Sequence, residues 1–515
     1  MVVPPTEGQA LGATFGTLAF FLIATLVLGR KGIFTKDTDA YMSARNTQGS
    51  FSLTMSFFAS GAGAWVLYTV PEAAVLGGPI AVCGYALSCI VPLLIFAWSA
   101  PYLRRNLPYG ITYYEYIQAR FGTAVNIYAT LISTFYMFLY LAAEFSSVGG
   151  AVSLFSGGAP GLGAIIGTSL ITLIYTSVGG LPVSLITDKV QGVGLVVFTI
   201  LVTIGVLGYC LFPEYEDAAD SATASANWKT VTSWGIGDVT HGSNPGHSFS
   251  MAIILISAVT SANLMHSGFQ QRIWAARDND AVRTGLYGAS ILTIPFILLF
   301  GFFGMVAFAQ FGIGGLVYPN YLAFLSAFFI IGMLPTGWQI LAIILAVMMV
   351  ASSADTIQTG LSGLFTPPIN RVLRIINKGA EPSKALAMGI NLALTAFLNI
   401  LAIILATQNI SVLSLFVLAD LLCATCCVPI LMGLNDKIHP VAALSGCISG
   451  FIALLIIYGV GLPGAGEAGN FVKILEYSRT ASKPRTQPSA PCLPQPAAPC
   501  GRRCFLRSLL LLALP

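Results

Sequence analysis

The stretch Ala59-Ser-Gly-Ala-Gly-Ala-Trp65 interrupts an apolar run that extends over about 51–78. Its two glycines weaken helical structure, because glycine loses more conformational freedom on folding than any other residue. An apolar run of this length otherwise predicts a transmembrane helix, in which non-helical backbone is tolerated only where it lines a buried cavity. The stretch therefore predicts a broken membrane helix whose bare carbonyl groups could coordinate a cation.

The rest of the chain has the same apolar character. Of its 515 residues 56% are hydrophobic and 9% are charged, and the mean hydropathy is +0.82, whereas soluble domains carry about 25% charged residues. The sequence therefore predicts an all-α polytopic membrane protein with about twelve transmembrane helices, a thirteenth being the alternative. The predicted spans are 12–29, 51–78, 79–101, 124–150, 162–178, 190–212, 248–268, 286–310, 337–360, 385–406, 410–432 and 442–461.

The connections between the spans alternate in charge. Those that follow odd-numbered spans carry sixteen Lys and Arg residues, whereas the intervening ones carry only Lys229. Positively charged loops stay in the cytoplasm, so residues 1–11 are predicted to be extracellular and the chain to be a multi-pass protein of the plasma membrane. The longest external loop is then about 213–247. After about 462 the chain becomes low in complexity, which predicts a disordered tail over 462–515.

Two further spans contain small and polar residues at membrane depth. Span 7 holds Ser257-Ala-Val-Thr-Ser-Ala-Asn-Leu-Met-His-Ser-Gly268, and span 9 holds Met349-Val-Ala-Ser-Ser-Ala-Asp355. The hydroxyls of Ser352 and Ser353 lie one turn after Met349, so they could converge with its carbonyl on one point. The alternative interpretation is close helix packing, for which membrane helices also use small residues.

The positions of these segments favour a binding site. Spans 2 and 7 are five apart, and interrupted helices at matching places in two halves are typical of inverted-repeat transporters. We therefore expect a transporter domain over 12–461, with a first repeat at about 51–212 and a second at about 248–432. The predicted solute site lies between the two broken helices, beside Gly63 and Trp65, with Asn263 on span 7. Trp65 offers an apolar face and one N–H donor, although it could instead be an ordinary interfacial tryptophan.

Four carboxyl groups lie within the apolar runs, at Glu72, Glu144, Asp355 and Asp420. A charge at the centre of a membrane helix costs about 2.5–3.5 kcal/mol on insertion scales, so such groups usually face a cavity or a partner. Glu144 is accordingly a candidate for solute binding. The alternative is a neutralised carboxyl with a structural role.

Other functional classes lack their motifs. No phosphate-cradling Gly-Lys-Thr/Ser loop is present, and no basic stripe with aromatic residues suggests nucleic-acid binding. The four histidines are not in a metal-ligand spacing. Cys423, Cys426 and Cys427 have no second ligand pair nearby to complete a zinc site, so we interpret them as small buried apolar residues. Nothing in the sequence suggests an enzyme.

Five linked segments resemble elements of the sodium:solute symporter family, over roughly residues 10–460. They are Asp39-Ala-Tyr-Met-Ser-Ala-Arg45, Ile111-Thr-Tyr-Tyr-Glu-Tyr-Ile-Gln-Ala-Arg-Phe-Gly122, the Gly-Gly and Thr-Asp-x-x-Gln pattern within 175–191, the segment 269–285 and Met349 to Asp355. The resemblance implies the leucine-transporter fold, with spans 2–6 and 7–11 as inverted repeats. It also implies sodium-driven symport of a small organic solute by alternating access.

The resemblance also implies a ligand set for the coupling sodium ion. Matched residue by residue, the family's ligands fall on Ala59, Ala62, Met349, Ser352 and Ser353. Asp188 matches the family's acidic residue on the cytoplasmic ion path, where we expect an exposed carboxylate that attracts sodium without trapping it. The alternative for Asp188 is a cap at the start of span 6.

Two positions depart from the family pattern. Gly61 stands where proline-transporting members carry Asp, which weakens a proline assignment. Glu144 stands where a neutral residue is common, which leaves proton coupling through Glu144 or Asp420 open. A channel and a transporter-like sensor are the further alternatives. Amino acids, urea, sugars and carboxylates all remain as solute classes, and the expected partners are the solute, sodium ions and the lipid bilayer, without nucleic acid.

Overall fold

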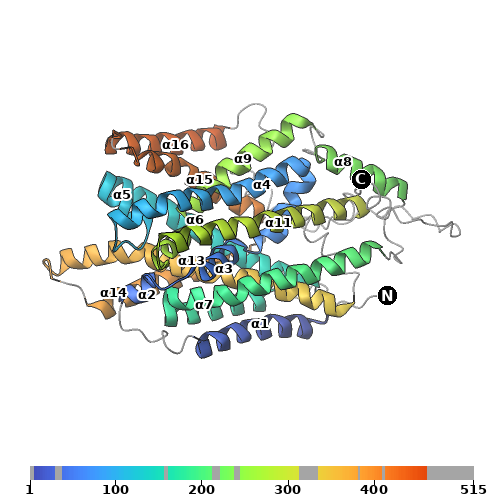
Figure 1. Cartoon of the computed structure of the whole chain (residues 1–515), viewed down its shortest axis with the longest axis horizontal. Coiled ribbons are helices and arrows are strands. Elements are labelled where there is room, and N and C mark those ends of the chain that lie inside the picture. Colours follow the sequence, from blue (N-terminus) through green and yellow to red (C-terminus); the bar gives the residue numbers. More distant parts are fainter. Residues whose placement is uncertain are drawn as a thin grey trace.

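The structure, a computed structural model, describes residues 5–28, 38–155, 161–211, 221–236, 244–311, 335–380, 383–408, 412–435 and 437–460. These residues form helices without a strand, and the long helices run side by side through the bundle (Figure 1). The helices are α1 (Glu7–Leu28), α2 (Thr38–Ser43), α3 (Ser50–Gly61), α4 (Trp65–Asn106), α5 (Tyr113–Phe121), α6 (Thr123–Phe155), α7 (Leu162–Leu211), α8 (Ser221–Ser233), α9 (Pro245–Met265), α10 (Ser267–Ala275), α11 (Asn279–Phe311), α13 (Thr336–Ile376), α14 (Lys384–Ala406), α15 (Val412–Met432) and α16 (Pro440–Val460). Eight of them are long and apolar enough to cross a membrane.

The 42-residue helix α4 contains two spans, because the chain reverses at Gly78. Gly78 has φ +65°, a backbone conformation that favours glycine. Trp65 and Tyr85 lie on opposite sides of it, yet their rings stack with centroids 5.4 Å apart. In a continuous helix, twenty residues would separate them by about 30 Å.

Helix α7 reverses in the same way at Gly180, which has φ +57°. Tyr175 and Thr187 lie before and after this glycine, and their hydroxyls both donate to Asp355 Oδ2, at 3.1 and 3.0 Å. With both reversals counted, α1, α3 with α4, α6, α7, α9, α11 and α13 to α16 contain the twelve predicted spans, so the predicted fold class is confirmed.

Helix α13 lies at the centre of the bundle. In its most apolar window 83% of the residues are buried, against 22% for α14 and 28% for α1. Polar groups on α13 therefore face protein rather than lipid, whereas the outer faces of α1 and α14 are exposed and apolar. This arrangement places the Met349–Asp355 segment in the interior.

The long connection after span 6 contains α8, which the sequence analysis did not anticipate. Val231 of α8 is fully buried against α4 and α11, and the Trp228 ring lies 6.1 Å from that of Phe302. The Ile236 amide donates to the Val75 carbonyl at 2.8 Å, next to the reversal at Gly78. The predicted tail 462–515 lies outside the described residues.

We predict that Gly180→Ala destabilises the protein by about 1–3 kcal/mol, because the residue would be strained at positive φ. A Cβ there would also lie 2.5 Å from the Tyr41 carbonyl oxygen. The measurement is thermal unfolding of the purified protein in detergent. Gly208→Ala is the matched control in the same helix, since open space surrounds Gly208 and alanine is the better helix former. Equal stability of the two variants would contradict the prediction.

Candidate functional site

The first helix break lies between α3 and α4, as the sequence predicts. Helix α3 ends at Gly61, and Ala62 has φ −90° and ψ 63°, outside the helical region. The Ala62 amide still donates to the Phe58 carbonyl at 3.0 Å and to the Ala59 carbonyl at 3.2 Å. Both alanines are buried, so the break lies in the protein interior.

Glu144 of α6 reaches into this break. Its Oε2 accepts a hydrogen bond from the Ala64 amide at 2.9 Å, at the start of α4. A carboxylate is favourable there, because the N-terminus of a helix carries partial positive charge. Gly63 lies directly against Glu144, since a Cβ on Gly63 would be 1.9 Å from Oε1. Glu144 is fully buried, and its Oε1 has no hydrogen-bond partner among the described residues.

The second break separates α9 from α10 at His266, which has extended backbone with φ −74° and ψ 101°. Side chains from other helices satisfy the carbonyls that the break frees. Tyr114 and Ser133 both donate to the Met265 carbonyl, at 2.9 and 3.0 Å, and Gln270 donates to that of Leu264 at 2.8 Å. The predicted interruption of span 7 is therefore present, and its backbone is supported by protein as membrane depth requires.

The predicted sodium ligands of span 9 lie on the inner helix α13. Met349, Ser352 and Ser353 are all fully buried. Ser353 Oγ donates to the Met349 carbonyl at 3.1 Å, so these two oxygens are adjacent, as the one-turn spacing predicts. Ser353 also lies close to Glu144. No cluster of metal-ligating His, Cys, Asp or Glu is found in the described part of the chain.

Asp188 connects the two halves of the predicted sodium site. Its Oδ2 accepts a hydrogen bond from Ser56 Oγ at 2.5 Å, and its Oδ1 accepts one from Ser352 Oγ at 3.0 Å. Ser56 lies on α3 one turn before Ala59, and Ser352 lies on α13. Asp188 of α7 therefore ties together the two helices that carry the predicted ligands.

The expectation that Asp188 is an exposed carboxylate or a helix cap is wrong. Asp188 is fully buried and forms an ion pair with Arg272, whose Nη2 lies 2.7 Å from Oδ2. The helix after Gly180 begins several residues before Asp188, so this carboxylate lies inside the helix. Arg272 also donates to the Thr356 hydroxyl at 2.7 Å and to the Gly268 carbonyl at 2.6 Å. A role on the ion path stays a prediction.

Asp355 occupies a neighbouring buried site without a basic partner of its own. Ser184, Thr187 and Tyr175 donate to its two oxygens at 2.9–3.1 Å. Hydroxyl groups therefore take the place of the cavity or charged partner that the sequence analysis expects for carboxyl groups at membrane depth. The donors come from both sides of the Gly180 reversal, and for that reason the sequence spacing did not reveal them.

Trp65 and Asn263, two of the predicted solute-binding residues, line one pocket. Gly61, Ala62, Cys89 and Phe269 contribute to the same pocket. Trp65 Nε1 is buried and has no hydrogen-bond partner among the described residues, which leaves one donor free. Gly63 and Glu144, the other two predicted residues, lie at the adjoining break and not on the wall of this pocket.

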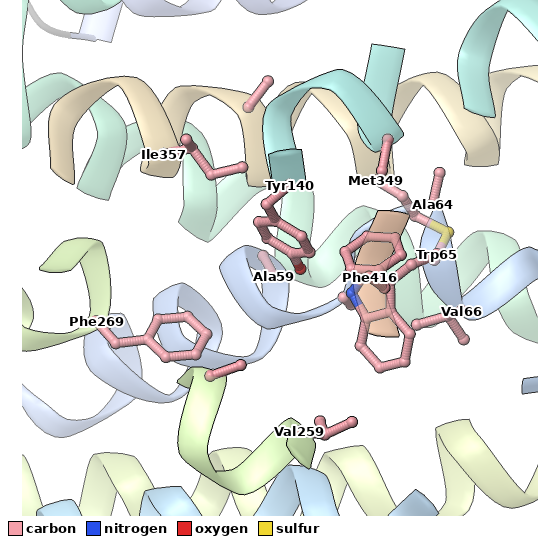
Figure 2. Close-up of a cluster of buried hydrophobic side chains, with 14 of the residues drawn as sticks. Ala59, Ala64, Trp65, Val66, Tyr140, Val259, Phe269, Met349, Ile357 and Phe416 are labelled. Carbon is pink, nitrogen blue, oxygen red and sulfur yellow. The ribbon is translucent and has the colours of Figure 1, made fainter. Parts of the chain in front are cut away.

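Aromatic side chains that the residue pattern did not reveal lie in the same buried cluster as Trp65. Figure 2 shows three of them, Tyr140, Phe269 and Phe416. The Tyr140 ring lies 4.9 Å from that of Phe416 and 5.8 Å from that of His266. Tyr136, Tyr140 and Glu144 follow one another at four-residue spacing on α6. That spacing was the signal that could have identified this face.

Polar contacts also secure the connection before α3. Arg45 forms an ion pair with Asp39, with Nη2 and Oδ1 2.6 Å apart, and donates to the Pro108 carbonyl at 2.7 Å. The hydrogen bond from Arg45 lowers the pKa of Asp39. The Asp39 side chain is 47% exposed, so this pair differs from the buried pair of Asp188 and Arg272.

Comparisons with known proteins agree with this architecture. The model of the sodium:solute symporter family matches residues 41–450. The spermidine transporter DUR31 of Candida albicans is 23% identical over 463 residues, which cover 88% of this chain and 81% of that protein. A Na+-coupled sialic acid symporter, solved in a substrate-bound outward-open state, has a TM-score of 0.68 at 20% identity and covers 92% of this chain and 95% of its own.

A further solved structure, the nucleobase-cation-symport-1 family transporter Mhp1 with bromovinylhydantoin bound, has a TM-score of 0.47 at 14% identity. The alignment covers 86% of this chain and 100% of that one. The likeness to the sialic acid symporter shows the fold, which is the leucine-transporter type that the sequence predicts.

We predict that Asp188→Asn lowers the free energy of unfolding by about 3–5 kcal/mol, because it leaves the buried Arg272 guanidinium without its counter-ion. Asp39→Asn, which removes the acid of the exposed pair, should cost only about 0.2–1 kcal/mol. Thermal unfolding in detergent without sodium measures both. A similar loss in the two variants would show that burial of the Asp188 pair does not govern its contribution.

Proposed function

The chain belongs to the sodium:solute symporter family, and on that premise we propose that it uses a sodium gradient to drive a small polar organic solute across the membrane by alternating access. As a family member it is a multi-pass membrane transporter and not an enzyme. The observation that carries the proposal is the convergence of a broken helix, buried hydroxyls on α13 and an unoccupied donor on Trp65 at the centre of the bundle.

The proposed sodium ligands are the carbonyl oxygens of Ala59, Ala62 and Met349 and the hydroxyls of Ser352 and Ser353. Hard cations prefer oxygen ligands, and buried carbonyl and hydroxyl oxygens supply them here without a formal charge. The bridge from Ser56 through Asp188 to Ser352 supports the proposal, because it holds α3 and α13 at fixed separation on the side of the site nearer α10.

We further propose that Asp188 lies on the path by which sodium leaves. In this conformation the Asp188 carboxylate is paired with the Arg272 guanidinium. A passing cation can replace Arg272 only if the guanidinium moves, so the pair would close the path until the helices rearrange. Two other hydrogen bonds of Arg272 go to Gly268 on the second broken helix and to Thr356 on α13, the elements expected to move against each other.

Proton coupling is the second candidate, and Glu144 favours it. A buried carboxylate oxygen without a partner is costly in the ionised state, so binding of a proton at Glu144 would stabilise the empty site. Exchange of sodium for potassium at fixed pH separates the two mechanisms: a sodium symporter stops concentrating solute, and a proton symporter continues. Concentrative uptake also excludes a channel or a sensor.

The two named relatives do not select the solute. Spermidine is a polycation and sialic acid is an anion, and the chain is 23% or less identical to the proteins that carry those names. The solute class therefore depends on the chemistry of this site. We also propose a location in the plasma membrane with residues 1–11 outside, which rests on the alternation of Lys and Arg between the connections.

We predict that replacing both Ser352 and Ser353 by Ala raises the sodium concentration for half-maximal uptake about tenfold or more, because two oxygen ligands are lost. The measurement is solute-driven current in vesicles at varied sodium. Ser290→Ala is the matched control, because Ser290 is a buried serine on α11 that donates to the carbonyl one turn earlier, as Ser353 does. Unchanged sodium dependence in a well-expressed double variant would rule out the proposed ligands.

We predict that Trp65→Ala weakens solute binding about tenfold or more while leaving sodium affinity nearly unchanged, because Trp65 lines the pocket and Ser352 and Ser353 do not. Trp65→Phe should recover part of the loss, since it restores an aromatic face without the donor. Solute-induced thermal stabilisation measures binding in each variant. Intact solute affinity and selectivity in the Ala variant would place the site elsewhere.

A further inference from the structure

We propose that the solute is an organic cation with at least two protonated amino groups, and that Glu72, Glu144 and Asp420 bind it between aromatic rings. The inference rests on the proposed function, because it assigns a substrate class to the same solute site. The bundle holds several acidic side chains that have no basic partner among the residues that the structure describes.

Acidic groups at membrane depth divide into two sets. Asp188 forms an ion pair with Arg272, and Asp355 accepts hydrogen bonds from four neighbouring hydroxyl groups. Within the described ranges, no ion pair includes Glu72, Glu144 or Asp420. Glu144 is 0% exposed and Asp420 is 7% exposed. Charges of this kind are costly in a membrane protein unless a partner neutralises them, so a ligand is the natural source of the missing positive charge.

The three carboxyl groups are arranged around Tyr85 and Tyr140. Tyr85 lies within electrostatic range of Glu72 and Asp420, and Tyr140 lies within range of Glu144 and Asp420. Tyr85 stacks on Trp65 and bonds Thr69, which is one helical turn from Glu72. These groups adjoin the Trp65 pocket, since Tyr85 stacks on Trp65 and Cys89, which lines that pocket, is within range of Asp420.

Glu144 and Asp420 are placed on either side of an aromatic contact. Helices α6 and α15 run antiparallel, because Tyr140 contacts Phe416 while Tyr128, three turns earlier, bonds Thr425, further along α15. On α6, Glu144 lies one turn after Tyr140. On α15, Asp420 lies one turn after Phe416, and because the helices are antiparallel this turn leads in the opposite direction. One turn in each direction therefore separates the Cα atoms of Glu144 and Asp420 by about 12 Å along the helix axes. That separation suits two amino groups joined by a chain of several methylenes.

The rings between the carboxyl groups complete the site. Protonated amines are attracted to the faces of Trp and Tyr rings, and methylene stems pack favourably on apolar surface. The ring of His266, which contacts Tyr140, is also buried, and its two nitrogens have no partner among the described residues. A neutral solute would leave the carboxyl groups unpaired, and an anion would be repelled by them.

The test uses the full chain, purified and reconstituted into vesicles with an inward sodium gradient. The probes are 1,4-diaminobutane, a linear triamine, urea, proline, glucose and N-acetylneuraminate. We expect the two amines to be concentrated and the neutral and anionic probes to be inactive. Asp420→Asn and Glu144→Gln should each raise the amine concentration for half-maximal uptake about tenfold or more, because each removes one charged hydrogen bond. Asp280→Asn, an exposed acid at the start of α11, is the control.

The outcomes separate this inference from the proposed function. Sodium-driven uptake of a neutral or anionic probe without uptake of the amines would overturn the cation assignment and leave sodium symport standing. Amine uptake that persists when potassium replaces sodium would support the cation assignment and overturn sodium coupling. Full amine affinity in both Asp420→Asn and Glu144→Gln would overturn the assignment.

A binding measurement covers the case in which those variants fail to fold. The unaltered protein should gain thermal stability with the diamine and not with urea or glucose. Glu72→Gln, at a partly exposed position, should reduce that gain. Absence of stabilisation by either amine would overturn the proposal without reference to any variant.

Discussion

The requirement that backbone polar groups find partners away from water governs this bundle. Each helix break frees carbonyl and amide groups at a depth where lipid offers no hydrogen-bond partners. At the first break Glu144 accepts a hydrogen bond from the Ala64 amide. At the second break Tyr114 and Ser133 donate to the Met265 carbonyl. Helices α5 and α6 thus supply the polar support for both breaks. The proposed solute and ion sites lie beside these supported breaks.

A second level of organisation comes from buried charge on and around α13. Arg272 of α10, Asp188 of α7 and Asp355 of α13 bond to one another or to side chains of α3, α7 and α13, so four helices from different parts of the sequence meet through one polar network. Such networks contribute less to net stability than to a defined arrangement, since the desolvation of the charges offsets much of their attraction. Rearrangement of one helix would then require the others to respond.

Much of the fold followed from the sequence because lipid imposes a strong pattern. The spans, the interruption at Gly61 to Gly63 and the converging oxygens of Met349 and Ser353 were all visible as departures from long apolar runs. The ion pair of Asp188 was not visible in the sequence, because its partner Arg272 lies 84 residues away on α10, the helix that follows the second break. The aromatic face of α6 was missed for a related reason: Tyr136 and Tyr140 look like ordinary membrane residues until Phe416 is placed opposite them.

The glycine reversals bear on how the protein is made. At Gly78 and Gly180 one span turns into the next through a single glycine, without a polar linker between them. Each such pair is a helical hairpin. A connection of one glycine is too short to let one span enter lipid while the other remains in water. We therefore expect the two members of each pair to leave the translocation machinery together during biosynthesis, so that topology at these two places is fixed two spans at a time.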